Sequence, residues 1–219
     1  MAGRSRSEAP TKDTSSRIYE AADELFCLRG YDGVSVGDIA ALAGVQKPLV
    51  FYHHGTKEAL FEKILVRYYE AHRAALEAAY REEGEPRARL HGLMDAYFDF
   101  ISKNRRYAAL VQQQVSNPET HPLIQKHLEP LFGWIEEVLL RVTPNEGPLA
   151  ARQFFVTFSG MVINYFTYAP FFARAWGDDP LSARALEERR EHLHWLIDRL
   201  LDGLERGARE AKRPTRRMA

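Results

Sequence analysis

One stretch of this sequence gathers basic and aromatic side chains and contains no acidic ones. From Gly44 to Lys57 there is no Asp or Glu. The basic residues and the phenol within that stretch are Lys47, Tyr52, His53, His54 and Lys57. Hydrogen-bond donors of this kind suit a polyanion, and a carboxylate among them would face the closely spaced phosphate charges of a nucleic acid. The composition of the stretch therefore favours contact with nucleic acid.

Two kinds of contact with DNA are predicted in and near this stretch. Lys47 can donate to guanine O6 and N7, and Gln46 can pair with an adenine edge. Pro48 and Leu49 offer apolar surface for a thymine methyl group. The predicted phosphate contacts come from Ser35, Tyr52, His53 and Lys57. Contacts of the first kind would specify a base sequence, and those of the second kind would position the protein on the DNA backbone.

The local sequence predicts that a helix, a tight turn and a second helix position these side chains. Ser35 is placed as an N-cap with Asp38 three residues later, and the short helix that follows ends at Gly44. Gly44 can adopt the left-handed conformation of a sharp turn, and Pro48 suits the first turn of the next helix. In helix-turn-helix proteins such a second helix presents its N-terminal residues to the major groove. The spacing alone leaves an alternative, a helical hairpin with a polar face and no DNA function.

The run VSVGDIAALAGVQKPLVFYHHGTKEALF resembles the DNA-binding domain of the TetR family of transcriptional regulators. The resemblance covers about residues 14–74, and the preceding AADELFCLRGYDGVSV is similar to the family's link into its second helix. It implies that Ser35 and Lys57 contact phosphate. It also implies that residues 47–49 and His53 face the bases.

Three positions depart from the family pattern. Phe51 stands where the family usually has a phosphate-binding tyrosine, His54 where an apolar or aromatic residue is usual, and Gly37 where a basic residue is frequent. Tyr52 offers a hydroxyl next to Phe51, and the resemblance leaves open whether it replaces the missing one.

The composition excludes several classes of protein. The 219 residues include 30 basic and 30 acidic side chains, so the formal net charge is zero and a uniformly basic DNA-coating protein is excluded. Cys27 is the single cysteine, which excludes an intrachain disulfide and a cysteine-based zinc site. The polar N-terminal residues lack the apolar run of a signal peptide, and a cytoplasmic location is expected.

The uncharged run from Gln153 to Ala173 is long enough to span a membrane. Polar residues such as Thr157, Ser159 and Asn164 interrupt it. A helix that is apolar on all sides also fits the centre of a helical domain. We therefore expect a buried helix here and no membrane contact.

Apolar residues recur at helical spacing almost throughout the chain, and no segment alternates as a half-buried strand does. We predict an all-α fold, in which an N-terminal three-helix helix-turn-helix DNA-binding domain precedes a C-terminal helical domain for ligand binding and dimerisation. The later helices are expected at about 87–103, 105–115, 122–141, 149–173 with a break near Pro170, and 182–207. The predicted organisation is a flexible basic arm at 1–13, a DNA-binding domain at 14–74, a connecting helix at 57–82, a ligand-binding and dimerisation domain at 75–208 and a basic tail at 209–219.

Aromatic side chains are concentrated in the second predicted domain. A well-packed core explains most of them, because aromatic residues contribute strongly to core stability. The family resemblance also implies an apolar cavity for an inducer, lined by a few polar groups that need partners when buried. The candidate ligand-binding residues are Tyr97, Gln113, Phe158, Asn164 and Tyr165.

The last predicted helix indicates a homodimer. It places one apolar stripe on one side, formed by Leu193, Ile197, Leu200 and Leu204. Together with the apolar helix before it, this stripe fits a four-helix bundle formed with a second copy of the chain. Two recognition helices about 34 to 36 Å apart in such a dimer would bind a palindromic DNA site.

Catalytic and metal-binding motifs are missing from the sequence. It has no HExxH, P-loop or Gly-x-Ser-x-Gly motif, and His192 and His194 cannot face the same way on a helix. We therefore predict no enzyme activity, no metal site and no cofactor. The predicted function is a repressor that an apolar or aromatic small-molecule ligand releases from a palindromic operator in double-stranded DNA. The alternative is a helical homodimer that binds an apolar ligand and has no DNA-binding function.

Overall fold

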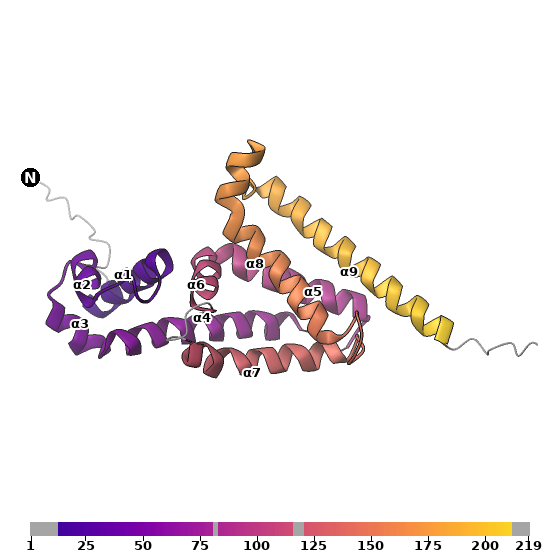
Figure 1. Ribbon diagram of the computed structural model, residues 1–219, viewed down its shortest axis with the longest axis horizontal. Helices are drawn as coiled ribbons and strands as arrows, with labels where there is room; N and C mark the ends of the chain where they lie inside the picture. The colour runs from indigo at the N-terminus through magenta and orange to yellow at the C-terminus, as the bar shows by residue number, and fades with distance from the viewer. Residues whose placement is uncertain (1–12, 81–82, 116–120, 212–219) are drawn as a thin grey trace, which may run out of the picture. The chain divides into compact units, whose positions relative to one another are not determined.

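The computed structural model describes residues 13–80, 83–115 and 121–211 of the chain (Figure 1). Within these ranges all regular secondary structure is helical, which confirms the predicted all-α fold. None of the helices in the described ranges has the length and apolarity of a transmembrane segment. The helices are α1 (Thr14–Arg29), α2 (Val36–Ala43), α3 (Lys47–His54), α4 (Lys57–Ala79), α5 (Pro86–Lys103), α6 (Arg105–Val115), α7 (His121–Leu140), α8 (Ala151–Trp176) and α9 (Ala183–Ala211).

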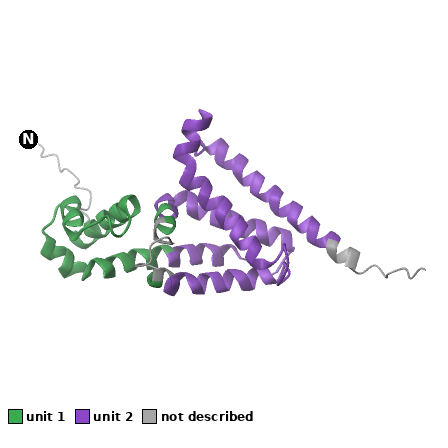
Figure 2. Ribbon diagram, viewed as in Figure 1, with its two compact units in different colours: residues 1–68, 109–124 green, residues 69–108, 125–219 purple. Residues whose placement is uncertain are grey.

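The chain divides into two compact units (Figure 2). Helix α4 belongs to the first unit up to Tyr68 and to the second unit from Tyr69, without a break between them. The predicted limits of the DNA-binding and ligand-binding domains stay a prediction, and the arm and tail fall almost entirely outside the described residues. The first unit comprises residues 1–68 and 109–124, and the second comprises residues 69–108 and 125–219.

The core of the first unit forms around α1. The carboxylate of Asp13 caps this helix by accepting a hydrogen bond from the Ser16 N–H at 2.9 Å. The rings of Phe26, Tyr31 and Phe61 pack together, with centroids 5.1 Å apart for Phe26 and Phe61 and 4.9 Å apart for Tyr31 and Phe61. This cluster joins α1 and α4, and Ile18, Ala22 and Leu25 of α1 are buried.

A row of ion pairs joins α5 and α9 in the second unit. Arg87 lies 2.7 Å from Asp198 and 2.8 Å from Asp202. Further along α5, Asp95 lies 2.8 Å from Arg190. Residue numbers rise on α5 while they fall on α9, so the two helices run antiparallel. These side chains are partly exposed, and solvent screens ion pairs at a surface. The row therefore fixes the register of the helices more than it stabilises them.

The predicted apolar stripe of α9 packs within one chain. Leu193 and Ile197 are buried inside the second unit, and Leu200 and Leu204 are partly buried. Trp195 is 56% exposed on the same helix. The stripe that we assigned to a second copy is thus largely used inside the unit, and a different side of α9 remains at the surface.

Helix α8 continues through Pro170 to Trp176, where the sequence predicted a break. A proline removes one backbone hydrogen bond from a helix interior, so the helix loses one bond at this point without ending. It ends at Gly177, which has φ 78 and donates its N–H to the Ala173 carbonyl.

A buried histidine lies in an aromatic cluster of the second unit. The His72 ring of α4 stacks on Phe100 with centroids 4.7 Å apart and on Tyr97 at 5.1 Å. Its Nδ1 lies 3.2 Å from the Tyr107 hydroxyl. Burial lowers the pKa of His72 to about 4, so the ring is neutral at physiological pH.

We predict that His72 makes the second unit sensitive to acid. Because the pKa of His72 is about 4 in the folded protein and about 6.5 in an unfolded chain, unfolding is accompanied by proton uptake between these values. The stability that the neutral ring contributes is complete above about pH 6.5 and is lost as the pH falls toward about 4. Between about pH 7 and about pH 5 the loss should be about 2 kcal/mol in the free energy of unfolding.

Chemical denaturation of the full chain at both pH values measures this loss. His72→Phe keeps an aromatic ring in the cluster and should show a flatter pH dependence than the wild type. His192→Phe, at an exposed position of α9, is the control and should keep the wild-type dependence. An unchanged dependence in His72→Phe would contradict the prediction.

Candidate nucleic-acid interface

The turn between α2 and α3 has the geometry that the sequence predicted. The Ser35 N–H donates to the Asp38 carboxylate at 2.8 Å, and the Asp38 N–H donates to Ser35 Oγ at 3.1 Å, which completes a capping box. Gly44 ends α2 in the left-handed conformation, at φ 64 and ψ 41. Its N–H donates to the carbonyls of Ala40 and Ala41, so the last turn of α2 is closed before the chain enters α3.

Helix α3 has an inner and an outer side. Val50 and His54 are buried, whereas Tyr52 is 82% exposed. His53 is partly exposed. Four of the residues predicted to contact bases lie at the exposed N-terminal end of the helix, namely Gln46, Lys47, Pro48 and Leu49. This is the end of a recognition helix that contacts base edges in helix-turn-helix complexes. His53, which the family resemblance also places toward the bases, lies near the C-terminal end.

Ser35 is exposed, but its hydroxyl already has a partner. Ser35 Oγ donates to the Asp38 carboxylate at 2.5 Å while it accepts from the Asp38 N–H. Hydrogen bonds from Ser35 lower the pKa of Asp38, so this carboxylate is ionised at neutral pH. Asp38 is thus the predicted capping residue, and it also places a negative charge beside the predicted phosphate contact, which the capping pattern did not indicate.

Lys47 extends from α3 toward the beginning of α2. A Cβ atom on Gly37 would lie 2.8 Å from Lys47 Cε, 3.1 Å from Lys47 Nζ and 3.4 Å from Ser35 Oγ. The absence of a side chain at Gly37 therefore makes room for the lysine. The family resemblance indicates a basic residue at position 37, and here the ammonium group of Lys47 lies at that place.

Lys57 holds the link between α1 and α2. Its Nζ donates to the carbonyls of Tyr31 at 2.9 Å and Val34 at 3.0 Å, and lies 3.9 Å from the centroid of the Tyr31 ring. An ammonium group has three N–H donors, and these two carbonyls account for two of them. The residue predicted to contact phosphate thus has a structural role that the sequence did not indicate.

The candidate ligand-binding residues have different environments. Tyr97 and Phe158 are buried, and Asn164 is exposed. Tyr165 is partly buried, and its hydroxyl donates to the Pro180 carbonyl at 2.6 Å. Gln113 belongs to α6, but its side chain lies outside the described part of the structure.

The arrangement defines a helix-turn-helix protein with a second, all-helical unit. Residues 18–64 match the family model described as bacterial regulatory proteins, tetR family. The chain is 30% identical over 102 residues to the HTH-type transcriptional activator FasR of Mycolicibacterium smegmatis, with 47% of each chain covered. It resembles the TetR family transcriptional regulator PfmR of Thermus thermophilus, with a TM-score of 0.58, 25% identity and coverage of 85% of this chain and 96% of that one. It also resembles the regulator FadR of Bacillus subtilis in complex with stearoyl-CoA, with a TM-score of 0.60, 18% identity and coverage of 80% and 95%.

These matches show that residues 18–64 form a domain of the kind found in bacterial regulatory proteins of the tetR family, and that the fold of the whole chain is similar to that of such regulators. The family resemblance noted in the sequence is thereby confirmed. The chain spans about half the length of the FasR relative that it matches. The matched proteins are named as transcriptional regulators, in agreement with the prediction that this chain is not an enzyme.

We predict that Lys57→Met lowers the stability of the first unit. The substitution removes the charged donor from the carbonyls of Tyr31 and Val34, and loss of a hydrogen bond to a charged group costs about 1.5 to 3 kcal/mol. Thermal unfolding should therefore show a lower transition temperature. Lys63→Met, at an exposed position of the same helix, is the control and should unfold like the wild type. Wild-type stability combined with weaker DNA binding in Lys57→Met would instead indicate a phosphate contact.

Proposed function

We propose that this protein is a transcriptional regulator that binds double-stranded DNA by inserting α3 into the major groove. The observation that carries the proposal is the division of α3 between buried Val50 and His54 and the exposed residues 46–49. A short helix with such an exposed N-terminal end matches the recognition helix of helix-turn-helix proteins. Contact with a bacterial operator requires a cytoplasmic location.

The proposed contacts fall into two groups. Gln46, Pro48 and Leu49 face the bases, because their side chains are exposed at the start of α3. Tyr52 and His53 contact phosphates further along the helix. The remaining residues of the proposed interface are Ser35, Lys47 and Lys57. Lys47 lies next to Gly37 at the start of α2 and can serve either group from there.

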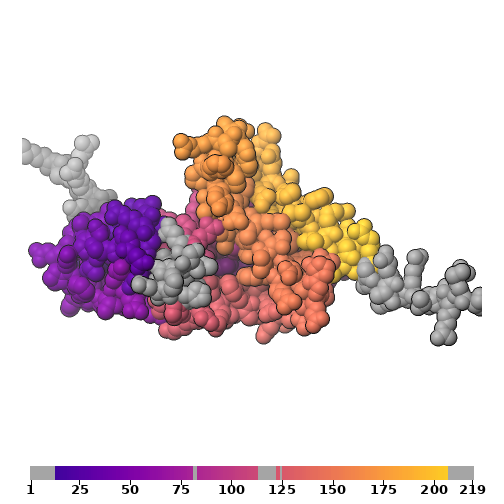
Figure 3. Space-filling view, viewed as in Figure 1, coloured from indigo at the N-terminus to yellow at the C-terminus, as the bar shows by residue number. Residues whose placement is uncertain are grey.

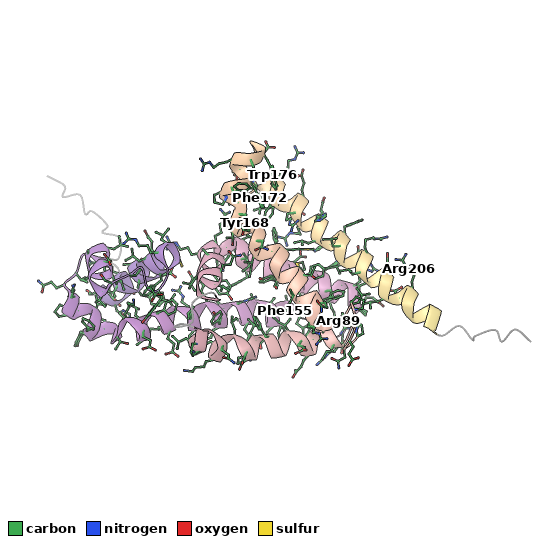
Figure 4. The ribbon with its side chains drawn as sticks, viewed as in Figure 1. Arg89, Phe155, Tyr168, Phe172, Trp176 and Arg206 are labelled. Carbon is green, nitrogen blue, oxygen red and sulfur yellow. The ribbon has the colours of Figure 1, made fainter. Side chains whose placement is uncertain are left out.

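A homodimer on a palindromic operator is part of the proposal. Large apolar side chains are exposed on the two helices that end the second unit, and a second copy of the chain would cover them. Along the last part of α8 the side chains of Tyr168, Phe172 and Trp176 follow one another (Figure 4), and this part lies at the surface beside α9 (Figure 3). The most exposed members are Val156, Tyr168, Phe171, Trp176 and Trp195.

An apolar or aromatic small molecule is the proposed effector of the second unit. FadR of Bacillus subtilis, whose fold is similar, is known in complex with stearoyl-CoA. Tyr97 and Phe158 offer buried aromatic surface, and Asn164, Tyr165 and Gln113 are the proposed polar contacts. Such a ligand would release the operator by favouring a form of the dimer that does not fit it. The ligand can change the free-energy difference between the two forms of the dimer only by as much as its binding free energies for them differ.

Selection of duplexes from a random library by the purified full chain tests the DNA-binding proposal. A palindrome should be enriched, and Lys47→Ala should weaken its binding. Loss of discrimination at one base pair would assign Lys47 to a base. A uniform loss over all sequences, with the salt slope reduced by about 1, would assign it to a phosphate. Lys63→Ala is the control, and no enrichment at low salt would favour a ligand-binding dimer without DNA function.

We predict that Trp195→Glu weakens the dimer. Trp195 is exposed within one chain, so the substitution does not disturb the core of the unit. It would place a carboxylate in a desolvated interface, which should raise the dissociation constant of the dimer by about hundredfold. Sedimentation velocity over a range of concentrations measures this change. Leu28→Glu, at an exposed apolar position of α1, is the control; equal dimerisation of both variants and the wild type would exclude this face as the interface.

A further inference from the structure

The first turn of α1 contacts the chain immediately before α3. Arg17 Nη2 donates to the carbonyl of Ala43 at 2.5 Å and to the carbonyl of Gly44 at 3.1 Å. Ala43 is the last residue of α2, and Gly44 forms the turn. Carbonyl groups at the C-terminal end of a helix lack donors within the helix and carry partial negative charge. A guanidinium group satisfies them with charge-assisted hydrogen bonds.

The first turn of α1 also contacts the other end of α3. His54 Nε2 lies 3.0 Å from the Ser15 carbonyl and 3.2 Å from the Ser15 hydroxyl. Burial lowers the pKa of His54, so the ring is neutral at physiological pH. A carbonyl can only accept, and Nε2 therefore carries the proton of this bond. Two residues of one turn of α1, Ser15 and Arg17, thus hold the two ends of the segment from Ala43 to His54.

These hydrogen bonds restrain the direction of α3, which apolar packing alone does not do. Val50 is buried on the inner side of α3, but apolar burial is non-directional and leaves a short helix free to rotate or slide. Hydrogen bonds are directional, and two of them at the turn fix where α3 begins. The approach is also close: a Cβ atom on Gly44 would lie 3.0 Å from Arg17 Nη2.

We propose that Arg17 is a positioning residue for sequence recognition, which sets the orientation of α3 through the carbonyls of Ala43 and Gly44. The inference rests on the proposed function of α3 as the recognition helix. It predicts an effect of Arg17 on discrimination between DNA sequences without contact between Arg17 and a base. A direct phosphate contact by the exposed guanidinium group is the competing explanation, and it predicts an effect on all DNA sequences equally.

Three variants of the full chain separate these explanations. Arg17→Ala removes both hydrogen bonds, and Arg17→Lys keeps a cation that can reach one carbonyl. Arg29→Ala removes the same charge from the other end of α1 and is the matched control. Thermal unfolding of each variant shows whether the fold is retained, and Arg17→Lys serves as the test variant if Arg17→Ala does not fold.

Amide hydrogen exchange without DNA is the first measurement. In Arg17→Ala, exchange of residues 44–54 should be faster by about tenfold, as expected for loss of a hydrogen bond to a charged group. Residues 58–65 of α4 should exchange at the wild-type rate, and Arg17→Lys should recover part of the protection. Wild-type exchange over residues 44–54 in Arg17→Ala would overturn the proposal. This measurement decides the positioning role even if the wild type selects no DNA sequence and the proposed function fails.

Binding to the selected duplex and to a scrambled duplex is the second measurement. Arg17→Ala should lose about tenfold or more in affinity for the selected duplex and less than about threefold for the scrambled one. Arg29→Ala should change both affinities by the same small factor. The affinity of Arg17→Lys for the selected duplex should lie between those of Arg17→Ala and the wild type. An equal loss on both duplexes in Arg17→Ala would overturn the proposal and assign Arg17 to phosphate.

Discussion

Helix α3 is too short to hold its own position, and the first unit is organised around this constraint. Isolated helices of fewer than about 12 residues are marginal in water, and α3 spans only Lys47–His54. Its buried side chains give it contact area, while His54 bonds to Ser15 at one end and Arg17 bonds to the turn that precedes the other end. The orientation of an exposed residue such as Tyr52 therefore depends on α1, which comes much earlier in the sequence.

Side chains that can donate to a phosphate can also donate to acceptors within the protein, and several of them do so in the first unit. Lys57 donates to the link between α1 and α2, and the hydroxyl of Ser35 is paired with Asp38. These contacts satisfy groups that would otherwise lack partners near the ends of helices. The surface that we propose for DNA is consequently centred on α3 and on the ammonium group of Lys47, which lies next to Gly37.

In the second unit, one side of α9 packs internally and another side lies at the surface. On α9, Leu193 points into the unit and Asp198 pairs with Arg87 of α5, whereas Trp195 is exposed. Helix α8 carries exposed aromatic residues as far as Trp176 because it continues through a proline that costs one hydrogen bond. Internal ion pairs and buried leucines thus leave exposed the apolar side chains that the proposed homodimer would cover.

The sequence by itself determined the features that act over a few neighbouring residues. Ser35 with Asp38 and the left-handed Gly44 were predictable because capping and turn conformation depend on local backbone geometry, and helical periodicity gave the all-α fold. Tertiary structure decided the partners of Lys57 and His54, which lie up to 26 and 39 residues away in the sequence. A side chain's type shows which groups it can bind, but only the packing of α1, α3 and α4 decides which of these groups comes within hydrogen-bonding distance.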